Sequence, residues 1–355
     1  MRVLLTGSAG FIGGAVDRAL AAAAHEVVRV DLLTPAAHGP DAAAPPGTHR
    51  LDVRDADRWR GLLRGVDVVC HQAAVVGAGV TVADLPAYAS HNDVGTAALL
   101  AAMSAEGVAR LVLASSMVVY GEGRYACPVH GDRVPPPRAP EALEAGEFDN
   151  HCPDCGQDLA WAPVDETARL DPRSGYAASK VAQEHYASAW ARQSGSAVVA
   201  LRYHNVYGPH MPRDTPYSGV AAMFRSSVER GEPPQVYEDG AQVRDFVHVD
   251  DVARANVLAV DAVSGSAAAP FAAYNVASGR PVTILRVAQL VSSGAERPVP
   301  PAVTGRYRAG DVRHVVASPA RATAELGFTA AVPPEDGLPA FATAPLRDGG
   351  AHQLV

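Results

Sequence analysis

One tyrosine and one lysine in this chain have the types and the spacing of an acid–base pair. Lys180 is the only lysine among the 30 lysine and arginine residues, so arginine stands at every other cationic position. An ammonium is a compact point charge with rotatable donors, whereas a guanidinium is a planar fork. Tyr176 precedes Lys180 by four residues, which places both side chains on one face of a helix.

A tyrosine accepts a proton near neutral pH only where its surroundings favour the phenolate. Because the ordinary pKa of the phenol is near 10, lowering it to neutrality takes roughly 3 pKa units, or about 4 kcal/mol. The Lys180 ammonium would supply part of this free energy by stabilising the phenolate. The pair therefore predicts a catalytic base; a surface tyrosine beside a solvated lysine is the alternative.

The N-terminal residues predict a dinucleotide site. An apolar strand at Arg2–Thr6 leads into a glycine-rich segment at 7–13 and a helix, and a second strand follows at Val27–Asp31. Glycines in such a βαβ unit let the backbone approach a pyrophosphate that lies on the helix N-terminus. A carboxylate that closes the second strand suits the adenosine ribose hydroxyls. Since Leu32 and Leu33 follow in place of arginine, NAD is favoured over NADP; a simple turn with a capping aspartate is the alternative.

Further strands and helices alternate along the chain. Strands are expected at Val66–Cys70 and Arg110–Ser115, with a helix at 92–106 between them. This alternation predicts an α/β fold with a Rossmann-type, doubly wound parallel sheet, whose ligands bind beyond the carboxyl ends of the strands. The predicted cofactor-binding residues are Gly7, Gly10, Phe11, Ile12, Gly13, Asp31, Asp52, Val53, Ala73, Ala74, Tyr176 and Lys180.

Composition narrows the classes of function. A chain of 355 residues with 48% hydrophobic and 19% charged residues suggests about two domains of an ordinary globular protein. The net charge of −8 argues against nucleic-acid partners and acidic membranes. No apolar run approaches the ~18 residues of a membrane span, and the N-terminal residues enter a strand without a signal-peptide pattern. We therefore expect a cytoplasmic protein.

Several motifs in the same order resemble those of the extended short-chain dehydrogenases/reductases, in the nucleotide-sugar epimerase/dehydratase family. The resemblance spans nearly the whole chain to about Leu326. It implies that Ser116 takes the catalytic serine/threonine position, Tyr176 the base and Lys180 its partner. The matching segments are TGSAGFIG (6–13), Asp31, LDVRD (51–55), HQAA (71–74), NDVGT (92–96), SSMVVYG (115–121), YAASK (176–180), LRYHNVYGP (201–209) and VRDFVHVDDVARAN (243–256).

The resemblance also implies an activity. The 4,6-dehydratases of the family carry an Asp-Glu pair directly after the catalytic threonine, where this chain has Met117 and Val118, which cannot transfer protons. We therefore expect an NAD-dependent nucleotide-sugar 4-epimerase that oxidises the sugar transiently to a 4-keto form and returns the hydride. A dehydratase, reductase or decarboxylase of the same family is one alternative. An NAD-sensing regulator is another, although such proteins usually lack the tyrosine–lysine pair.

A cysteine-containing insertion separates Ser116 from Tyr176. Cys127-Pro-Val-His130-Gly and Cys152-Pro-Asp-Cys155-Gly are two knuckles that offer two metal ligands each. Three thiolates and one imidazole suit a closed, structural zinc site, predicted at Cys127, His130, Cys152 and Cys155, with His151 as a substitute for His130. A disulfide between Cys152 and Cys155, or coincidental cysteines, are the alternatives. The insertion resembles that of bacterial proteins assigned to dTDP-L-rhamnose 4-epimerization, which favours a dTDP-deoxyhexose over a UDP-hexose.

The substrate is expected to bind the second half of the chain. By resemblance, Asn205 contacts the nucleotide sugar, whereas Arg244 and Arg308 hold its diphosphate through bidentate hydrogen bonds. Asp239-Gly240 indicates a hairpin turn. The family likeness also implies a homodimer.

The same pattern suggests a division into domains. The NAD-binding domain is expected at 1–205 and 241–270, with a zinc-ribbon-like insertion at 124–165 that could cover the sugar pocket. A smaller, mixed α/β substrate domain is expected at 206–240 and 271–341. The tail at 342–355 is expected to be poorly ordered.

Overall fold

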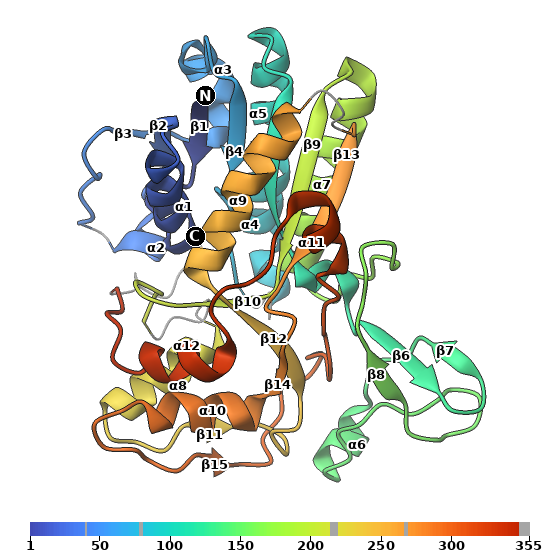
Figure 1. Ribbon diagram of the computed structural model, residues 1–355. Coiled ribbons are helices and arrows are strands. Elements are labelled where there is room, and N and C mark those ends of the chain that lie inside the picture. The colour runs from blue at the N-terminus through green and yellow to red at the C-terminus, as the bar shows by residue number, and fades with distance from the viewer. Residues whose placement is uncertain (40, 78–80, 214–218, 266–268, 348–355) are drawn as a thin grey trace.

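A parallel sheet of seven strands forms the larger part of the molecule (Figure 1). The computed structural model describes residues 1–39, 41–77, 81–213, 219–265 and 269–347. Across the sheet the strands run in the order β13-β9-β5-β4-β1-β2-β3, and every neighbouring pair is parallel. Their bounds are β1 (Arg2–Thr6), β2 (Glu26–Asp31), β3 (Thr48–Arg50), β4 (Val68–His71), β5 (Arg110–Ser116), β9 (Ala197–Tyr203) and β13 (Phe271–Val276).

The predicted α/β, Rossmann-type fold is confirmed by this sheet. The chain fills the sheet outward from β1 toward β3 and then, in the opposite direction, from β4 toward β13. Ligands of doubly wound sheets bind at such a reversal, outside the carboxyl ends of the strands. The four strands whose bounds are expected from the sequence begin and end within two residues of β1, β2, β4 and β5.

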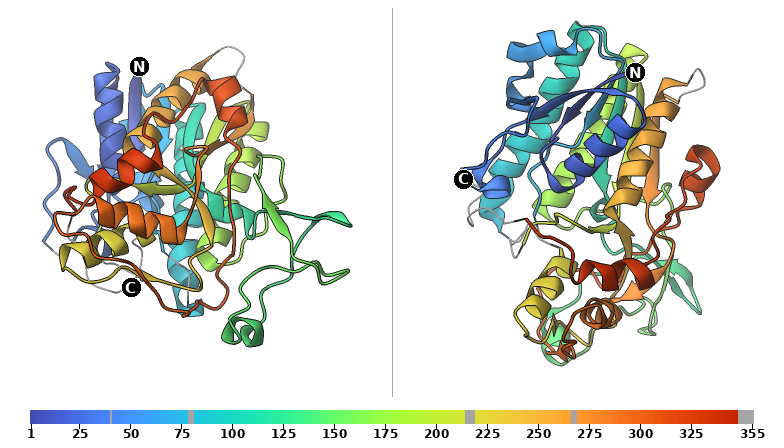
Figure 2. Two further views of the ribbon diagram at one scale, coloured as in Figure 1. Left: turned by 60° about the horizontal axis from the view of Figure 1, so that its bottom comes forward. Right: turned by 60° about the vertical axis from the view of Figure 1, so that its left-hand side comes forward.

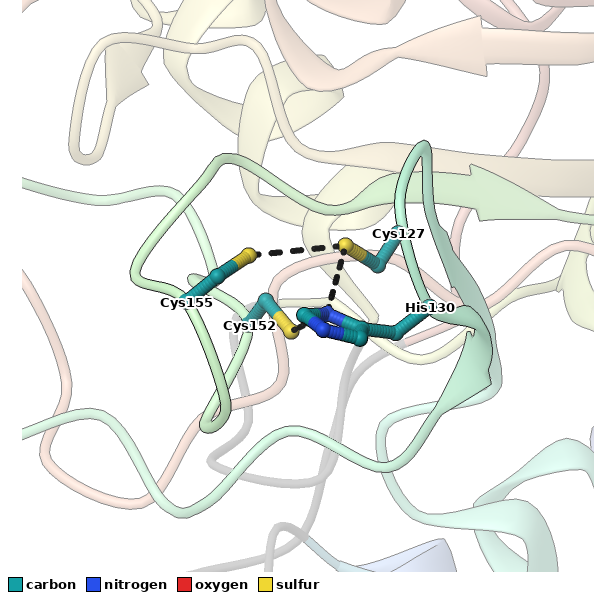
Figure 3. Close-up of side chains that lie close together, drawn as sticks. All are labelled: Cys127, His130, Cys152 and Cys155. Atoms are coloured by element: carbon teal, nitrogen blue, oxygen red, sulfur yellow. Dashed lines mark hydrogen bonds between the residues drawn. The ribbon is translucent and has the colours of Figure 1, made fainter.

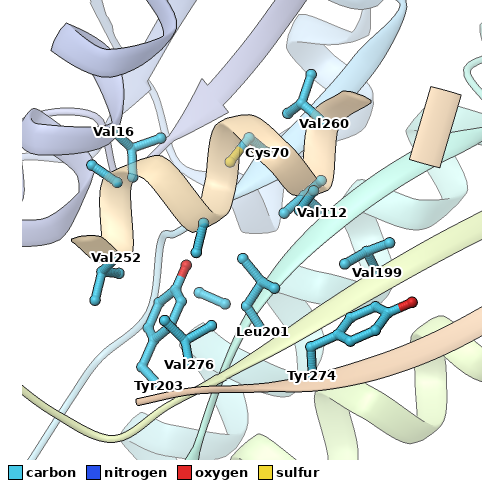
Figure 4. Packing of buried hydrophobic residues seen from close by; sticks show 14 of the residues in the cluster. Val16, Cys70, Val112, Val199, Leu201, Tyr203, Val252, Val260, Tyr274 and Val276 are labelled. Carbon is cyan, nitrogen blue, oxygen red and sulfur yellow. The ribbon is translucent and has the colours of Figure 1, made fainter. Parts of the chain in front are cut away.

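Helices cover both faces of the sheet because its strands are apolar on both faces. Val3 and Leu5 pack on one face with α1 (Phe11–Ala22), α9 (Val249–Ser264) and α11 (Ala320–Leu326), whereas Leu4 packs on the other. Figure 4 shows part of the first cluster, where side chains from α1 and α9 meet those of β5 and β9. The second face is covered by α3 (Ala56–Trp59), α5 (Gly95–Ala105) and α7 (Gly175–Ser194).

Short helical segments connect these elements. The helix expected at 92–106 begins as a π-helical segment, η4 (Ala89–Val94), and continues as α5. π-helical turns often occur at functional sites. The other segments are α2 (Pro35–His38), η1 (Val53–Asp55), η2 (Arg60–Leu63), η3 (Val82–Asp84), α4 (Leu85–Tyr88) and η5 (Met117–Tyr120).

A smaller part lies beyond the carboxyl ends of the large sheet (Figures 1 and 2). It has its own core of buried side chains, which includes Tyr207, Phe224, Phe246 and Val287. Its elements are β10 (Asn205–Tyr207), β12 (Val243–His248) and β14 (Pro281–Thr283), β11 (Gln235–Val236) and β15 (Ala302–Val303), and helices α8 (Val220–Glu229), α10 (Ile284–Ser293) and α12 (Pro334–Phe341).

Two details differ from the sequence-based expectation. The strand β13, expected in the substrate domain, is the edge strand of the large sheet because its apolar residues pair with β9 and pack on both faces. The hairpin expected at Asp239-Gly240 is wrong: β11 pairs in parallel with β15, whereas β12 pairs with β10 and β14. The turn instead contributes one partner of an ion pair, because the Asp239 carboxylate accepts two hydrogen bonds from Arg313.

The insertion projects from the rest of the molecule (Figure 1). It contains three short antiparallel strands in the order β7-β6-β8. The helix α6 (Pro140–Glu144) lies between β7 and β8 in the sequence. The strands are β6 (Arg124–Cys127), β7 (Gly131–Arg133) and β8 (Ala160–Ala162). Its apolar cluster has only four members, Tyr125, Cys127, Cys152 and Leu159, among the described residues. A core of this size needs additional cross-links.

The expectation of poor order is wrong for the first part of the tail. The Arg347 carbonyl accepts a hydrogen bond from the Arg213 amide at 2.9 Å, and the Pro345 carbonyl accepts one from the His210 amide at 2.7 Å. Residues 342–347 thus pack on the smaller part, whereas 348–355 lie outside the described residues. Within the described ranges, no helix is both long enough and apolar enough to cross a membrane.

Candidate functional site

A cavity of about 440 Å³ lies at the carboxyl ends of the central strands, between the large sheet and the smaller part. Every residue predicted to bind the cofactor lines it. Ser116 and Asn205 line it as well, whereas Arg244 and Arg308 do not. The fold thus brings together fourteen residues that are spread over some 200 positions of the sequence.

The glycine segment forms one wall of the cavity, and the space requires glycine. Gly7 has a φ of +68°, and a Cβ there would lie 2.7 Å from the Ala73 amide nitrogen. At Gly13 a Cβ would lie 1.9 Å from the Gly7 carbonyl oxygen. Since α1 begins at Phe11, the free amides of its first turn lie beside the cavity. This wall suits an anion that approaches the backbone closely.

Asp31 lies at the end of β2, where the chain's own amides hold its carboxylate. It accepts hydrogen bonds from Ala9 N at 2.9 Å and Leu33 N at 2.8 Å, and His38 Nε2 lies 3.5 Å away. Burial acts to raise the pKa of Asp31, but these hydrogen bonds outweigh it and hold the pKa below its ordinary value. The carboxylate therefore keeps its charge beside the cavity. His38, which also lines the cavity, was missed because an isolated histidine has no motif.

Asp52 follows β3 and is paired within its own turn. Arg54 donates to the carboxylate from Nη2 at 2.6 Å and from Nε at 2.9 Å. Burial opposes ionisation, but the bonds from Arg54 lower the pKa of Asp52 below its ordinary value. The Asp52 carboxylate is therefore paired with Arg54 within the protein. Val53, the next residue, also lines this side of the cavity.

Tyr176 and Lys180 lie in the first turns of α7, as the spacing predicts. The helix is capped by Ser174, whose Oγ accepts from the Ala177 amide at 3.2 Å. Lys180 is almost completely buried, and its Nζ donates to the Ala114 carbonyl at 3.0 Å while lying 5.9 Å from the centroid of the Tyr176 ring. Burial lowers the pKa of Lys180 to about 8.

Ser116, the last residue of β5, lies against the tyrosine. Burial raises the pKa of Tyr176, Tyr88 adds to the rise, and a hydrogen bond with Ser116 opposes it. The direction is opposite to the one expected from Lys180 alone, because desolvation of the phenolate outweighs the attraction of the ammonium. A base at this position needs a further positive charge nearby.

Asn92 fixes the geometry of this region, and the sequence analysis assigned it no role. Its Oδ1 accepts from Val75 N at 2.8 Å, and its Nδ2 donates to the Val75 carbonyl and to Ser179 Oγ, each at 2.9 Å. Asn92 lies in η4 and is fully buried, so it ties the cavity wall after β4 to α7. The NDVGT segment was the signal that could have identified it.

A buried ion pair anchors α7 to the sheet. Arg202 of β9 donates to Glu184 at 2.9 Å from Nε and at 2.7 Å from Nη2, and Ser115 Oγ donates to the same carboxylate at 2.5 Å. Glu184 lies one turn after Lys180 on the same helix and raises its pKa against the effect of burial. The ammonium therefore has a fixed position and a compensating charge.

Asn205 lines the cavity, and its side-chain oxygen is available to accept a hydrogen bond. Its Oδ1 is buried and has no hydrogen-bond partner among the described residues. The neighbouring His204 also lines the cavity, and burial lowers its pKa to about 3, so it is neutral. A polar ligand that donates a hydrogen bond would satisfy the amide oxygen of Asn205.

Arg244 and Arg308 lie farther along the smaller part. Arg244 is buried, and its guanidinium donates to the carbonyls of Arg313 at 2.8 Å and Val312 at 2.6 Å. Arg308 is exposed and lies over the ring of Tyr237 at 5.4 Å. Tyr237 in turn lines a second cavity of about 490 Å³. The structure thus places the two arginines outside the cavity that contains Tyr176.

The four predicted metal ligands lie together in the insertion (Figure 3). Their ligand atoms all lie within 4.8 Å of one another. His130 Nδ1 is 3.5 Å from the Sγ atoms of Cys127 and Cys152, and the Sγ atoms of Cys127 and Cys155 are 3.7 Å apart. All the thiols are free, so the alternative disulfide is not formed.

His151, the alternative ligand, lies outside this cluster. Its Nδ1 is 3.0 Å from Asp158 Oδ1 on the exposed surface. None of the residues that line the cavity around Tyr176 comes from 124–165. The insertion therefore does not cover that cavity in the part of the chain that the structure describes.

Comparison with known families gives a consistent result. Residues 3–142 and 155–277 match the model of the NAD dependent epimerase/dehydratase family. The dTDP-L-rhamnose 4-epimerase of Burkholderia thailandensis is 34% identical over 337 residues, which cover 92% of this chain and 90% of that protein. The match to the family model omits residues 143–154, which lie in the insertion.

Solved structures share the whole fold. The UDP-glucose 4-epimerase of Thermotoga maritima with UDP-glucose has a TM-score of 0.77 at 27% identity, and the match covers 96% of this chain and 97% of that one. The UDP-glucose 4-epimerase of Thermus thermophilus in complex with NAD has a TM-score of 0.71 at 31% identity, covering 96% and 98%. The similarity therefore extends over both parts of the molecule.

Proposed function

Because this chain belongs to the NAD-dependent epimerase/dehydratase family, we propose that it is a nucleotide-sugar 4-epimerase. The observation that carries the proposal is the arrangement of Tyr176, Ser116 and Lys180 at the cavity, with Met117 and Val118 directly after the serine. Tyrosine and serine hydroxyls can exchange and orient one proton. The two apolar side chains cannot perform the further acid–base steps that expulsion of water requires.

Tyr176, Ser116 and Lys180 have different roles in the proposed reaction. Tyr176 removes the proton from the sugar 4-hydroxyl through its phenol oxygen and later returns it. Ser116, which shares a hydrogen bond with Tyr176, orients the same sugar oxygen. Lys180 holds a positive charge 5.9 Å from the tyrosine ring and is kept there by Ala114 and Glu184. Since the keto form must receive hydrogen on its opposite face, the cavity must let the sugar turn.

The cavity fits NAD as the cofactor. The glycine wall at Gly7 and Gly13 admits a diphosphate to the backbone, and Asp31 remains ionised where the adenosine ribose would lie. Bound NAD would supply the hydride acceptor and donor, together with the positive ring that favours the Tyr176 phenolate. The residues given above as cofactor-binding are the ones we assign to it.

For the substrate we propose a dTDP-deoxyhexose, with a UDP-hexose as the alternative. The support is the 34% identity to a dTDP-L-rhamnose 4-epimerase and the presence of the two-knuckle insertion. In this scheme Asn205 uses its free acceptor on the nucleotide sugar, and Arg308 and Arg244 serve the diphosphate. The second cavity beside Tyr237 then receives the nucleotide, which makes the smaller part the substrate domain.

Incubation with candidate sugars and no added reductant tests the function. Purified protein with dTDP-L-rhamnose, other dTDP-hexoses or UDP-hexoses, followed by NMR, should yield a pair of 4-epimers at equilibrium. Release of a keto sugar or loss of carbon dioxide would instead identify a dehydratase, reductase or decarboxylase of the family. Absence of turnover with preserved NAD binding would favour a regulator.

We also propose that the cysteine cluster holds one structural zinc ion. In a tetrahedral site with metal–sulfur bonds near 2.3 Å, the S···S edges are about 3.8 Å and the S···N edges about 3.6 Å. The observed separations of 3.7 Å and 3.5 Å agree with this geometry. Four protein ligands close the coordination shell, so the ion would staple the small core of the insertion.

Two further proposals concern the state of the protein in the cell. A reducing cytoplasm would keep the four thiols available to the metal. A homodimer would cover apolar side chains that are exposed on neighbouring elements, namely Leu85 of α4, Val94 of η4 and Tyr186 of α7. Light scattering on the purified protein tests the dimer, since a monomer at micromolar concentration would contradict it.

A further inference from the structure

The described C-terminal residues run from the smaller part back to the cavity. The Arg347 amide donates a hydrogen bond to the Met211 carbonyl at 3.2 Å, and the Arg347 carbonyl accepts one from the Arg213 amide at 2.9 Å. Two residues earlier, the Pro345 carbonyl accepts from the His210 amide. These backbone bonds fix the direction in which the Arg347 side chain leaves the chain.

The Arg347 side chain reaches the glycine wall. Its Nη1 donates to the Ala9 carbonyl at 3.0 Å, and the residue lines the same cavity as Gly7, Gly10 and Gly13. Its Nε is buried and has no hydrogen-bond partner among the described residues. Burial lowers the pKa of Arg347, and the charge of Asp31 opposes this effect.

Within the described ranges the Arg347 guanidinium, which is partly buried, donates only to a neutral carbonyl. Removing the charge from water without an anionic partner is costly, so its retention indicates an anionic ligand. The position of Arg347, between the amides at the start of α1 and the carboxylate of Asp31, is where a dinucleotide changes from phosphate to adenosine ribose. Guanidinium suits phosphate because its donors form a planar fork. The neighbouring Asp31 carboxylate would repel a phosphate on the ribose itself.

We propose that Arg347 binds a diphosphate oxygen of the NAD cofactor and thereby makes the C-terminal segment a strap that retains it. The inference rests on the proposed function, because it takes NAD to be the cavity's cofactor. It also supplies a physical reason for the strap: a cofactor that accepts and returns one hydride must stay bound through each turnover. The sequence gives no motif for this contact, since Arg347 lies 334 positions after Gly13.

Binding measurements on cofactor-free protein test the proposal without using turnover. Isothermal titration would compare wild type with Arg347→Ala and Arg347→Gln, using NAD, ADP and adenosine as probes; Gln retains a donor for Ala9 but removes the charge. We expect both variants to bind NAD and ADP about tenfold more weakly and adenosine unchanged. Should the alanine variant fail to fold, the glutamine variant decides the question. Arg286→Ala, an exposed arginine of α10, is the matched control and should bind all three as wild type does.

Several results would overturn the inference. They are unchanged NAD and ADP affinity in a folded Arg347 variant, an equal loss of adenosine affinity, or weaker NADP binding with NAD binding intact. If wild type binds NAD and the variants bind equally well, only the role of Arg347 falls. If wild type itself binds no NAD, the proposed function falls with it.

Discussion

The surroundings of Tyr176 separate the group that orients the phenol from the group that carries positive charge. The Ser116 side chain forms a hydrogen bond with the Tyr176 hydroxyl, whereas Lys180 Nζ donates to the Ala114 carbonyl and lies 5.9 Å from the centroid of the tyrosine ring. Burial nevertheless raises the pKa of Tyr176. In the proposed function the phenol is placed for proton transfer, and the positive ring of bound NAD would be needed to favour its phenolate.

Replacing Tyr176 by phenylalanine should lower turnover at least about 100-fold, because the phenol oxygen is the only atom lost. Binding of NAD should persist, since the ring remains. Epimer formation followed by NMR measures the first effect, and titration with NAD measures the second. Tyr186→Phe on the exposed face of the same helix is the control and should keep full turnover. A Tyr176→Phe variant with wild-type turnover would exclude the tyrosine as the base.

His71 predicts a dependence of stability on pH. It is fully buried between Thr6 Oγ1 at 2.7 Å and Thr96 Oγ1 at 3.1 Å, and burial, with a contribution from Lys180, lowers its pKa to about 3. In the unfolded chain His71 binds a proton below about pH 6.5, whereas in the folded chain it does so only near pH 3. The part of the free energy of unfolding that depends on neutral His71 is therefore fully present above pH 6.5 and is lost as the pH falls toward 3. The loss should approach about 1.4 kcal/mol per pH unit.

Urea denaturation at pH 7.5, 6.5, 5.5 and 4.5 measures this slope. The His71→Asn variant, which keeps hydrogen-bonding groups for both threonines, should lose less free energy of unfolding between pH 6.5 and 4.5 than wild type does. His185→Asn, on the exposed surface of α7, should leave the slope unchanged. Equal slopes for wild type and His71→Asn would mean that His71 is not the group responsible.

At the scale of elements, the insertion is the part with the smallest core. Its four clustered apolar residues include two of the cysteines, so the same side chains serve packing and the predicted metal site. Backbone amides of Val129 and His130 counteract the effect of burial on Cys127 and lower the pKa of its thiol. A thiol that ionises readily is a better metal ligand.

Protein purified without added zinc should contain one zinc ion per chain by elemental analysis. Cys127→Ser and Cys155→Ser should lose the ion and lower the stability of the insertion, because metal binding free energy is folding free energy at such sites. Cys70→Ala, which changes the buried cysteine of β4, is the matched control and should keep the ion. Clearly less than one zinc per chain in wild type, with free thiols, would remove the site.

At the scale of the whole molecule, a buried ionic network joins the insertion to the smaller part. Arg138 of the insertion donates two hydrogen bonds of 2.9 Å to Glu238, and Arg313 donates to Glu238 at 2.9 Å. Arg313 also bonds to Asp149 of the insertion and to Asp239. Since the Arg313 carbonyl accepts a hydrogen bond from Arg244, the network also positions an arginine that we propose for the substrate diphosphate.

The Glu238→Gln change should lower the free energy of unfolding by about 3 kcal/mol, because it leaves two buried guanidinium groups without their shared anion. Urea denaturation followed by circular dichroism measures the change. Hydrogen exchange should rise in 124–165 and in 311–314 if the network holds the two segments together. Glu296→Gln at an exposed position should change stability by less than about 0.5 kcal/mol. Equal stability of both variants would show that the network contributes nothing.

Local sequence determined the parts of this protein that depend on short-range chemistry. The apolar strands, the glycine turn before α1, the Tyr176–Lys180 spacing and the two cysteine knuckles each concern residues within a few positions of one another, so pattern alone identifies them. Tertiary structure decided which distant groups share a space. The placement of β13 in the large sheet, the Glu238 network, the packing of residues 342–347 and the approach of Arg347 to Ala9 depend on how remote segments pack, and no local pattern encodes that. The direction of the Tyr176 pKa was decided in the same way, because desolvation is a property of the folded surroundings and not of the sequence around the tyrosine.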